Sequence, residues 1–414
     1  MGLRRLRCSI LAVGDFPEGG ATSQRLYLLA KLLNEGSFDT SLCILHPVSK
    51  VPLKENNTTA GEWGGVKFTY LSGSIVRPTA AVAVLLDTLR GILKSLFLIA
   101  SRAQDRPDVL VLYTPNFMKY IIPMIVAKLL RIPIIVEICE IFSYSTDSKE
   151  VGILRRIANS GESLMEKLIP VMSVGQLVIS KRIRQYYENI GPPRKPAYML
   201  PVLIDFERYE KGGVAAVNNL RGARFLLNSG SFNEKDGLDY LVQSVAKVRR
   251  ECPEIRLVFT GSATISTQEK ILEQAGPTGK DWITFTGFLS REELIWCYKN
   301  AEGLLCCRSN SDYANYGFPT KLAEYLASGR PVVATTVGDV EDYLADEDSA
   351  FLAEPENVES ISHAILRLVR DPARADIVGS RGAQVARQQF DYGNYAEGVS
   401  RYIRERIGVK FQDN

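Results

Sequence analysis

The residues with the clearest chemical potential lie in the stretch 316–335, which reads Tyr-Gly-Phe-Pro-Thr-Lys-Leu-Ala-Glu-Tyr-Leu-Ala-Ser-Gly-Arg-Pro-Val-Val-Ala-Thr. Pro319 and Gly329 predict the two ends of a short helix. Lys321 then places a cation in the first turn, at the positive end of the helix dipole, where an acidic side chain is normally favoured. A bound anion reverses this preference. The free backbone N–H groups and Lys321 would together form a diphosphate site.

Glu324 follows three residues later, on roughly the same face of this helix. Its carboxylate could accept hydrogen bonds from both hydroxyls of a ribose. The alternative is an ordinary surface ion pair between Lys321 and Glu324. In the first interpretation the charges of Lys321 and Glu324 bind a ligand, and in the second they bind each other.

Histidine is scarce, which removes several kinds of catalytic site. His46 and His363 are too few for a multi-histidine zinc site, and a Ser-His-Asp hydrolase would have to use one of them. The seven cysteines are scattered without a Cys-x-x-Cys, which is typical of free thiols in a reducing compartment. The Asp-x-Asp at residues 346–348 is interpreted as a surface acidic loop. We therefore expect no metal and no cofactor.

The composition is that of a globular protein without a large polyanion-binding surface. Its 414 residues include 50 Lys and Arg and 47 Asp and Glu, for a formal net charge of +3. A nucleic-acid binder normally has a marked basic excess, so we expect no nucleic acid among the partners. With 46% hydrophobic residues the chain can bury large cores, and its length predicts two or three domains.

The first half of the chain alternates short apolar strands with helical patterns. The apolar run 9–13, the loop 14–20 and a helix that Thr22 or Ser23 could cap form a strand–loop–helix opening. This alternation indicates an open parallel α/β sheet. Its further strands are predicted at residues 41–45, 109–113, 134–138 and 170–174.

The same order restarts after a linker rich in proline and glycine. It begins with a strand at 224–229, a loop at 230–237 and a helix at 238–248, and further strands are predicted at residues 256–260, 282–286, 303–307, 331–335 and 350–352. We therefore predict two facing Rossmann-like parallel-sheet domains, at residues 1–205 and 206–390, with a cleft between them. The final helix, in residues 391–414, is expected to pack back on the first domain. Ligands in such sheets bind at the carboxyl ends of the strands.

One segment has the composition of a membrane-surface helix. Residues 80–102 are strongly apolar, with Arg90, Lys94 and Arg102 interspersed, and could lie on an anionic lipid surface. A helix packed in the domain core is the alternative. The longest uncharged stretch, residues 168–180, is well short of the roughly 20 residues that span a bilayer. We expect a cytoplasmic protein, with peripheral contact at the inner face of the membrane left open.

The stretch 316–335 resembles the donor-binding segment of family 4 glycosyltransferases, which have the GT-B fold. More narrowly, it resembles a bacterial subgroup of cell-surface polysaccharide synthesis with the pattern Phe-Pro-Ser/Thr-Lys-x-x-Glu-Tyr, here residues 318–325. Gly19-Gly20 with Arg25 resembles the family's N-terminal glycine loop, whose backbone faces the donor diphosphate.

The second half adds further likenesses in the same order and spacing. Residues 230–237, Gly-Ser-Phe-Asn-Glu-Lys-Asp-Gly, resemble the opening of the family's nucleotide-binding half. Residues 259–262 and 285–288 resemble its next two strand ends, the latter usually lying beside the base. By this resemblance the donor site would contain Gly19, Gly20, Gly230, Ser231, Gly261, Phe288, Asn315, Tyr316, Gly317, Phe318 and Thr320.

The chain also departs from the family pattern. Most members have a Glu-x7-Glu pair, whose second member matches Glu324 and whose first falls on Tyr316, so Asn310, Asp312 or Asn315 would contact the donor sugar instead. The usual Arg after the first glycine of the second half is Ser231. The usual Lys before its second glycine is Asp236, one residue after Lys235. In this register Lys235 and Lys321 offset the diphosphate charge.

The first half departs from the family at the end of one strand. Where many members have His-Asp, this chain has Glu137-Ile-Cys-Glu140, so Cys139 replaces the histidine. Glu137 and Glu140 then become candidates for binding or activating an acceptor. A buried Cys139 beside a solvated Glu140 is the structural alternative.

The resemblance implies a retaining glycosyltransferase that moves a sugar from a nucleotide-diphosphate donor to a glycan or polyprenyl-linked acceptor. Lys321, Glu324, Lys235 and Glu140 would be its catalytic residues. A sugar-nucleotide epimerase on the same fold and a non-catalytic, degenerate transferase in an assembly complex are the two alternatives. The scarcity of histidine counts against the epimerase, and retention of Lys321 and Glu324 counts against the degenerate transferase.

Overall fold

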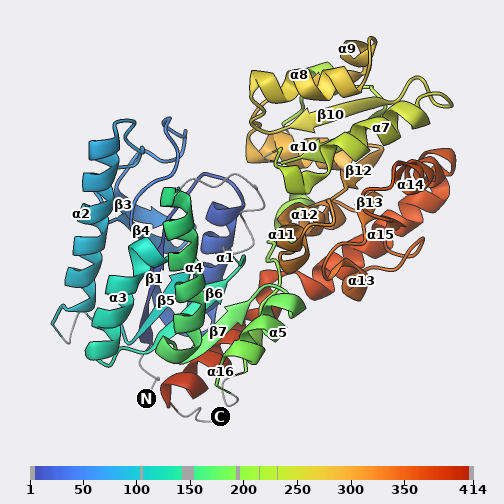
Figure 1. Cartoon of the computed structure of the whole chain (residues 1–414). Helices are drawn as coiled ribbons and strands as arrows, with labels where there is room; N and C mark the ends of the chain where they lie inside the picture. Colours follow the sequence, from blue (N-terminus) through green and yellow to red (C-terminus); the bar gives the residue numbers. More distant parts are fainter. Residues whose placement is uncertain are drawn as a thin grey trace. The chain divides into compact units, whose positions relative to one another are not determined.

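The computed structural model describes residues 5–102, 106–141, 153–192, 196–213, 215–230 and 232–409. The chain divides into two compact units (Figure 1). Unit 1 consists of residues 1–203 together with 392–414, and unit 2 consists of residues 204–391. The last segment of the chain therefore belongs to the first unit.

Unit 1 is built on an eight-stranded sheet in the order β3-β4-β2-β1-β5-β6-β7-β8. Neighbouring strands are parallel except for the antiparallel β3–β4 pair. The sheet interior is apolar, as parallel strands covered on both faces require. The strands are β1 (Leu6–Ala12), β2 (Phe38–Ile44), β3 (Ala60–Trp63), β4 (Val66–Tyr70), β5 (Val109–Tyr113), β6 (Ile134–Ile138), β7 (Gly175–Val178) and β8 (Tyr198–Met199).

Two groups of helices pack around this sheet. Helices α1 (Ala21–Glu35) and α16 (Ala396–Ile407) pack together and share one apolar core with β1 and β2. The other group is a row in which α2 contacts α3 and α3 contacts α4 (Figure 1). Its members are α2 (Ala81–Ile99), α3 (Phe117–Leu129) and α4 (Ile153–Met172), and α5 (Lys181–Ile190) packs against α4.

Two local predictions in unit 1 are wrong. The residues predicted as a strand at 170–174 are divided between the last turn of α4, which contains Pro170, and the turn before β7. Met165 and Ile169 are buried four residues apart, so a helical period governs this apolar run. Helix α1 begins after Gly20 without a side-chain cap, and the Ser23 hydroxyl donates instead to the Asp15 carbonyl at 2.7 Å.

Unit 2 has a fully parallel six-stranded sheet in the order β11-β10-β9-β12-β13-β14. In this order β9 lies between β10 and β12. The strands are β9 (Phe225–Ser229), β10 (Arg256–Thr260), β11 (Ile283–Phe285), β12 (Gly303–Cys306), β13 (Val332–Thr335) and β14 (Phe351–Ala353).

The helices of unit 2 cover its sheet, and α7 and α14 pack together over an apolar core. A capping box, in which Ser290 and Glu293 bind each other's backbone N–H groups, begins α10. The helices are α6 (Phe206–Lys211), α7 (Leu238–Val248), α8 (Ile265–Gln274), α9 (Gly279–Trp282), α10 (Arg291–Asn300), α11 (Asp312–Tyr316), α12 (Thr320–Ala327), α13 (Val340–Tyr343), α14 (Val358–Arg370) and α15 (Pro372–Gln389).

A buried ion pair fixes the carboxyl edge of the unit 1 sheet. The Arg25 guanidinium on α1 lies 2.6 Å from the Glu137 carboxylate on β6, and the Glu137 side chain is fully buried. Arg25 also donates to the carbonyls of Leu200 and Pro201. Burial raises the pKa of Glu137, and the adjacent Arg25 opposes that shift. The pair connects α1, β6 and the segment after β8.

Breaking this pair on one side should destabilise unit 1 strongly. Arg25→Met leaves a buried carboxylate without its cation and is expected to lower the free energy of unfolding by about 3–5 kcal/mol. Arg25→Met/Glu137→Leu should recover much of that loss, since neither charge then remains. Denaturant unfolding measures both. The exposed Lys67–Asp39 pair provides the control, because Lys67→Met should change stability by about 1 kcal/mol or less. A double variant no more stable than Arg25→Met would contradict this account.

Candidate functional site

Three glycines bring the ends of neighbouring strands together in unit 2. Gly230 follows β9, and its N–H donates to the carbonyl of Thr260 at the end of β10. Gly261 donates to the Gly287 carbonyl beyond β11 at 2.9 Å. Gly261 has a φ of 128°, and a Cβ there would overlap the carbonyl oxygen of Gly230. Only glycine allows this approach of one backbone to the other.

Lys321 lies directly against this glycine edge. Its side chain comes from the first turn of α12, and a Cβ on Gly230 would be 3.1 Å from the Lys321 Nζ. The Nζ also lies 2.8 Å from the Asp236 carboxylate, which comes from the loop between β9 and α7. Both side chains are largely buried, with 14% and 7% of their surfaces exposed. Two loops and one helix therefore meet at a single ammonium group.

Both members of this pair stay charged. Burial acts to lower the pKa of Lys321, but the Asp236 carboxylate outweighs it, so the pKa lies above its usual value. For Asp236, burial acts to raise the pKa, and Lys321 with its hydrogen bond lowers it below the usual value. The site consequently contains a fixed cation at a helix N-terminus, a place where anions bind well.

Glu324 does not pair with Lys321, so the simple ion-pair alternative is not what the fold forms. The Glu324 carboxylate lies 2.9 Å from the Arg291 guanidinium and accepts a hydrogen bond from the Tyr298 hydroxyl at 3.2 Å. Arg291 also donates to the Tyr209 hydroxyl and lies over its ring. Residues from α6, α10 and α12 thus fix the orientation of one carboxylate.

Hydroxyl groups connect Glu324 to the end of β9. The Ser229 backbone N–H donates to the Tyr325 hydroxyl at 2.6 Å. The Ser229 hydroxyl lies 3.0 Å from the hydroxyls of both Tyr298 and Tyr325. These groups are buried, and such a connected network fixes its members in one arrangement.

The motif residues around α12 divide into two groups. Phe318 is buried and packs on the Tyr343 and Phe390 rings, with both centroids 5.4 Å away, so its side chain belongs to the core. The buried Asn315 amide donates to Asn310 and Ser311 and accepts from the Gly338 N–H. These two side chains shape the loop. Half-buried residues of the same segment are Tyr316, Gly317 and Thr320.

Two further residues extend the site at its edges. Phe288 follows β11 and is 59% exposed, which leaves its ring face available for stacking. The Lys235 ammonium lies 4.3 Å from the Tyr313 ring centroid, a cation–π contact that connects the loop before α7 to α11. Ser231 lies outside the described residues.

The predicted residues of unit 1 are distributed differently. Gly20 is the N-cap of α1, and Gly19 lies against Ser23, where a Cβ would overlap the hydroxyl. Glu137 is occupied by Arg25 and buried, so an acceptor cannot reach it. Cys139 and Glu140 are half-buried at the end of β6. Glu140 lines a small pocket together with Thr114, Glu162, Glu166 and Tyr187.

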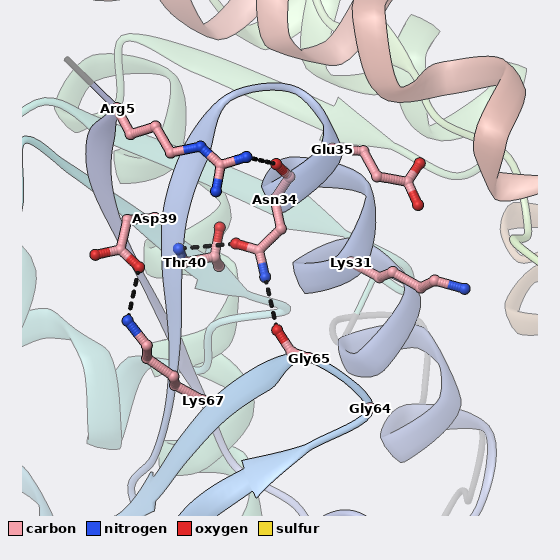
Figure 2. Close-up of a pocket in the computed structure, with 9 residues that line it drawn as sticks. All are labelled: Arg5, Lys31, Asn34, Glu35, Asp39, Thr40, Gly64, Gly65 and Lys67. Atoms are coloured by element: carbon pink, nitrogen blue, oxygen red, sulfur yellow. Dashed lines mark hydrogen bonds and ion pairs between the residues drawn. The ribbon is translucent and has the colours of Figure 1, made fainter.

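A larger pocket of about 400 Å³ lies at the opposite edge of the unit 1 sheet (Figure 2). It is lined by residues at the start of β2 and β4 and the end of α1, which is the amino edge of those strands. Its polar groups bind one another. Asn34 donates to the Gly65 carbonyl, and Lys67 pairs with Asp39 at 3.0 Å. Its place in the fold separates it from the strand ends where ligands of α/β sheets bind.

Sequence reasoning missed two arginines of the unit 2 site. Arg291 follows a capping box and gave no signal of its own, because its partner Glu324 is far away in the sequence. Arg308 is buried after β12, donates to the Gly317 carbonyl at 3.5 Å and helps to lower the pKa of Asp236. The clue in the sequence was an arginine directly after the apolar run 303–307, which was predicted to be a strand.

The described residues contain no group of three or more His, Cys, Asp or Glu side chains placed to hold a metal ion. The acids at residues 346–348 are partly exposed and paired with arginines. Arg367 lies 2.9 Å from Asp346 and 2.7 Å from Glu347, and Arg381 pairs with Asp348. They form a surface loop, as predicted.

Comparison with known proteins gives this geometry a context. Residues 223–371 match the family model described as glycosyl transferases group 1. Over 204 residues the chain is 26% identical to O-antigen chain mannosyltransferase B of Escherichia coli. This alignment covers 49% of the present chain and 48% of the relative. The chain thus spans about half the length of this curated relative.

Solved structures match over almost the whole chain. Sucrose-phosphate synthase from Thermosynechococcus elongatus superposes with a TM-score of 0.74 at 16% identity and covers 98% of this chain and 100% of that one. Anabaena HepE, solved in complex with UDP and glucose, has a TM-score of 0.69 at 13% identity and covers 97% and 100%. The chain therefore has the GT-B fold and carries in its second unit a domain of the group 1 glycosyltransferases.

Proposed function

We propose that this protein is a retaining glycosyltransferase. It moves a sugar from a nucleotide-diphosphate donor to a hydroxyl of a glycan or lipid-linked acceptor in cell-surface polysaccharide synthesis. The observation that carries the proposal is the position of the Lys321 ammonium. It is a buried cation in the first turn of α12, beside a strand edge kept open by Gly230 and Gly261.

A diphosphate fits this position for three physical reasons. The N-terminus of α12 favours negative charge, and its first backbone N–H groups lack partners within the helix. The glycine edge lets phosphate oxygens approach the backbone. Lys321 supplies a full charge where burial strengthens electrostatic interactions. Lys235 is the second cation of the proposed site.

The proposed reaction is a front-face substitution at the anomeric carbon. The bond from that carbon to the acceptor oxygen forms as the bond to the diphosphate oxygen breaks. The acceptor proton passes to the departing diphosphate, which takes both bonding electrons. The protein's part is to stabilise the charge that grows on the leaving group, and Lys321 is placed for this role.

Glu324 is proposed to bind the ribose of the donor. Its carboxylate is held by Arg291 and Tyr298, so it is oriented before the donor arrives. Such preorganisation lowers the cost of binding. Phe288, exposed at the next strand end, provides a ring against which the base can stack.

In unit 1 we propose Glu140 as the residue that meets the acceptor. It is half-buried at the carboxyl end of β6, whereas Glu137 is closed off by Arg25.

Among the described residues no helix is both long and apolar enough to cross a bilayer. We propose that the protein works in the cytoplasm at the inner face of the membrane.

Removing the Lys321 charge should slow turnover. Lys321→Ala is expected to lower kcat by about 10²-fold or more at saturating donor, the order typical for loss of a preorganised charge stabiliser. The double variant Lys321→Ala/Asp236→Asn should be as slow as Lys321→Ala. It should be more stable than Lys321→Ala, because it leaves no buried carboxylate without a cation. The exposed Lys280→Ala is the matched control. Near-normal kcat in Lys321→Ala would overturn the assignment.

Glu324 and Arg291 should affect donor binding more than turnover. Glu324→Gln is expected to raise the donor KM by about tenfold or more, since hydrogen bonds to a charged carboxylate are stronger than those to an amide. Arg291→Met should act in the same direction, because the carboxylate loses its orientation. Steady-state kinetics with varied donor measure both, with the exposed Arg256→Met as control. An unchanged KM in Glu324→Gln would exclude the ribose role.

A donor panel separates this proposal from its alternatives. The purified protein is incubated with UDP-glucose, GDP-mannose and related donors, with and without an acceptor, and products are identified by mass and by anomeric NMR signals. A retaining transferase forms a glycoside with the donor's anomeric configuration, and a glycoside of the opposite configuration would contradict the retaining mechanism. Conversion of donor alone to an isomer would support an epimerase, and binding to no donor would support a degenerate transferase.

A further inference from the structure

Helix α2 exposes most of the large apolar side chains along one side. A helix on the surface of a soluble domain normally buries such residues and exposes polar ones. In α2 the buried residues are Gly91, Ile92, Ser95 and Ile99, and Gly91 packs so closely that a Cβ would overlap the Leu45 carbonyl. The exposed large side chains, each at least 45% accessible, are Val82, Leu85, Leu86, Leu89, Leu93 and Phe97.

The neighbouring helix α3 repeats this arrangement. Its exposed apolar side chains follow a spacing of three or four residues, which places them in one stripe. They are Met118, Ile122, Ile125 and Leu129, each at least 44% accessible. Helices α2 and α3 pack side by side in unit 1 (Figure 1). We call these two stripes together the α2–α3 apolar face.

Basic residues flank both stripes. Arg90 and Lys94, both exposed, directly follow Leu89 and Leu93 in α2. In α3 the exposed Lys128 ammonium donates to the Val171 carbonyl at 3.2 Å, whereas Lys119 is half-buried. Helices α2 and α3 together contain four basic residues and a single acidic one, Asp87. Long basic side chains beside an apolar stripe can reach the headgroups while the stripe enters the acyl region.

We propose that the α2–α3 apolar face docks this protein on an anionic lipid surface, with both helices lying in the plane of the interface. Charge complementarity selects this occupant. In a symmetric dimer through the same face, the basic flanks of one copy would meet those of the other. Docking would bring the active site to a lipid-linked acceptor, and this purpose rests on the proposed function. The docking surface itself does not depend on that function.

The test measures binding of the purified full chain to vesicles of phosphatidylcholine with and without phosphatidylglycerol. Wild type should co-sediment with anionic vesicles. Leu89→Glu/Phe97→Glu should lower the partition coefficient by at least about tenfold, because two side chains can no longer enter the acyl region. Arg90→Gln/Lys94→Gln should lower the partition coefficient on anionic vesicles by about fivefold for each charge removed. Binding of this variant to neutral vesicles should equal that of wild type.

The matched control is Ile190→Glu/Ile377→Glu, which changes exposed apolar residues elsewhere and should bind vesicles like wild type. Thermal melting confirms that each variant is folded. Equal vesicle binding by wild type and Leu89→Glu/Phe97→Glu would overturn the proposal. A wild-type dimer in solution that this variant converts to monomer would also overturn it and identify a second copy as the occupant. Nucleotide binding in solution, measured in parallel, shows separately whether the proposed donor site works.

Discussion

A buried ammonium group is stable in a protein only when an anion lies against it, and this requirement organises unit 2. Asp236 comes from the loop after β9 and Lys321 from the start of α12, so their 2.8 Å contact joins a loop and a helix that lie far apart in the sequence. A diphosphate would compete with Asp236 for the same ammonium or share it. The site can therefore keep its charge before a ligand arrives without leaving that charge unpaired.

Unit 1 meets the same requirement with a different result. Arg25 is satisfied by Glu137 and by two backbone carbonyls, and both side chains are almost completely buried. This pair holds the strand edge but presents no charge to a ligand. Lys321 keeps part of its surface exposed, lies in the first turn of a helix and adjoins Gly230. The helix N-terminus and the glycine backbone beside the cation, more than its charge, distinguish the Lys321 pair from the Arg25 pair.

The sequence predicted the elements better than their contacts. Buried parallel strands appear as apolar runs, and glycines lie in the loops after β1 and β9, so both strand–loop–helix openings were predictable. The strand at 170–174 failed because an apolar run fits a helix as well as a strand. The partners of Glu324 and Lys321 were also missed. Spacing reveals neighbours on one helix, whereas Arg291 and Asp236 come from other elements.

Helix α2 shows the same limit in a different form. Its sequence is apolar on several sides, so composition fits either a core helix or a lipid-facing one. The decision comes from packing, because Gly91 brings the helix backbone close to Leu45, directly after β2, and the small buried residues Gly91 and Ser95 contribute little apolar surface. Apart from Ile92 and Ile99, most of the larger side chains of the helix remain exposed. Small residues on the buried side of an apolar helix are thus a sequence signal for an exposed apolar face, once the contact that needs them is known.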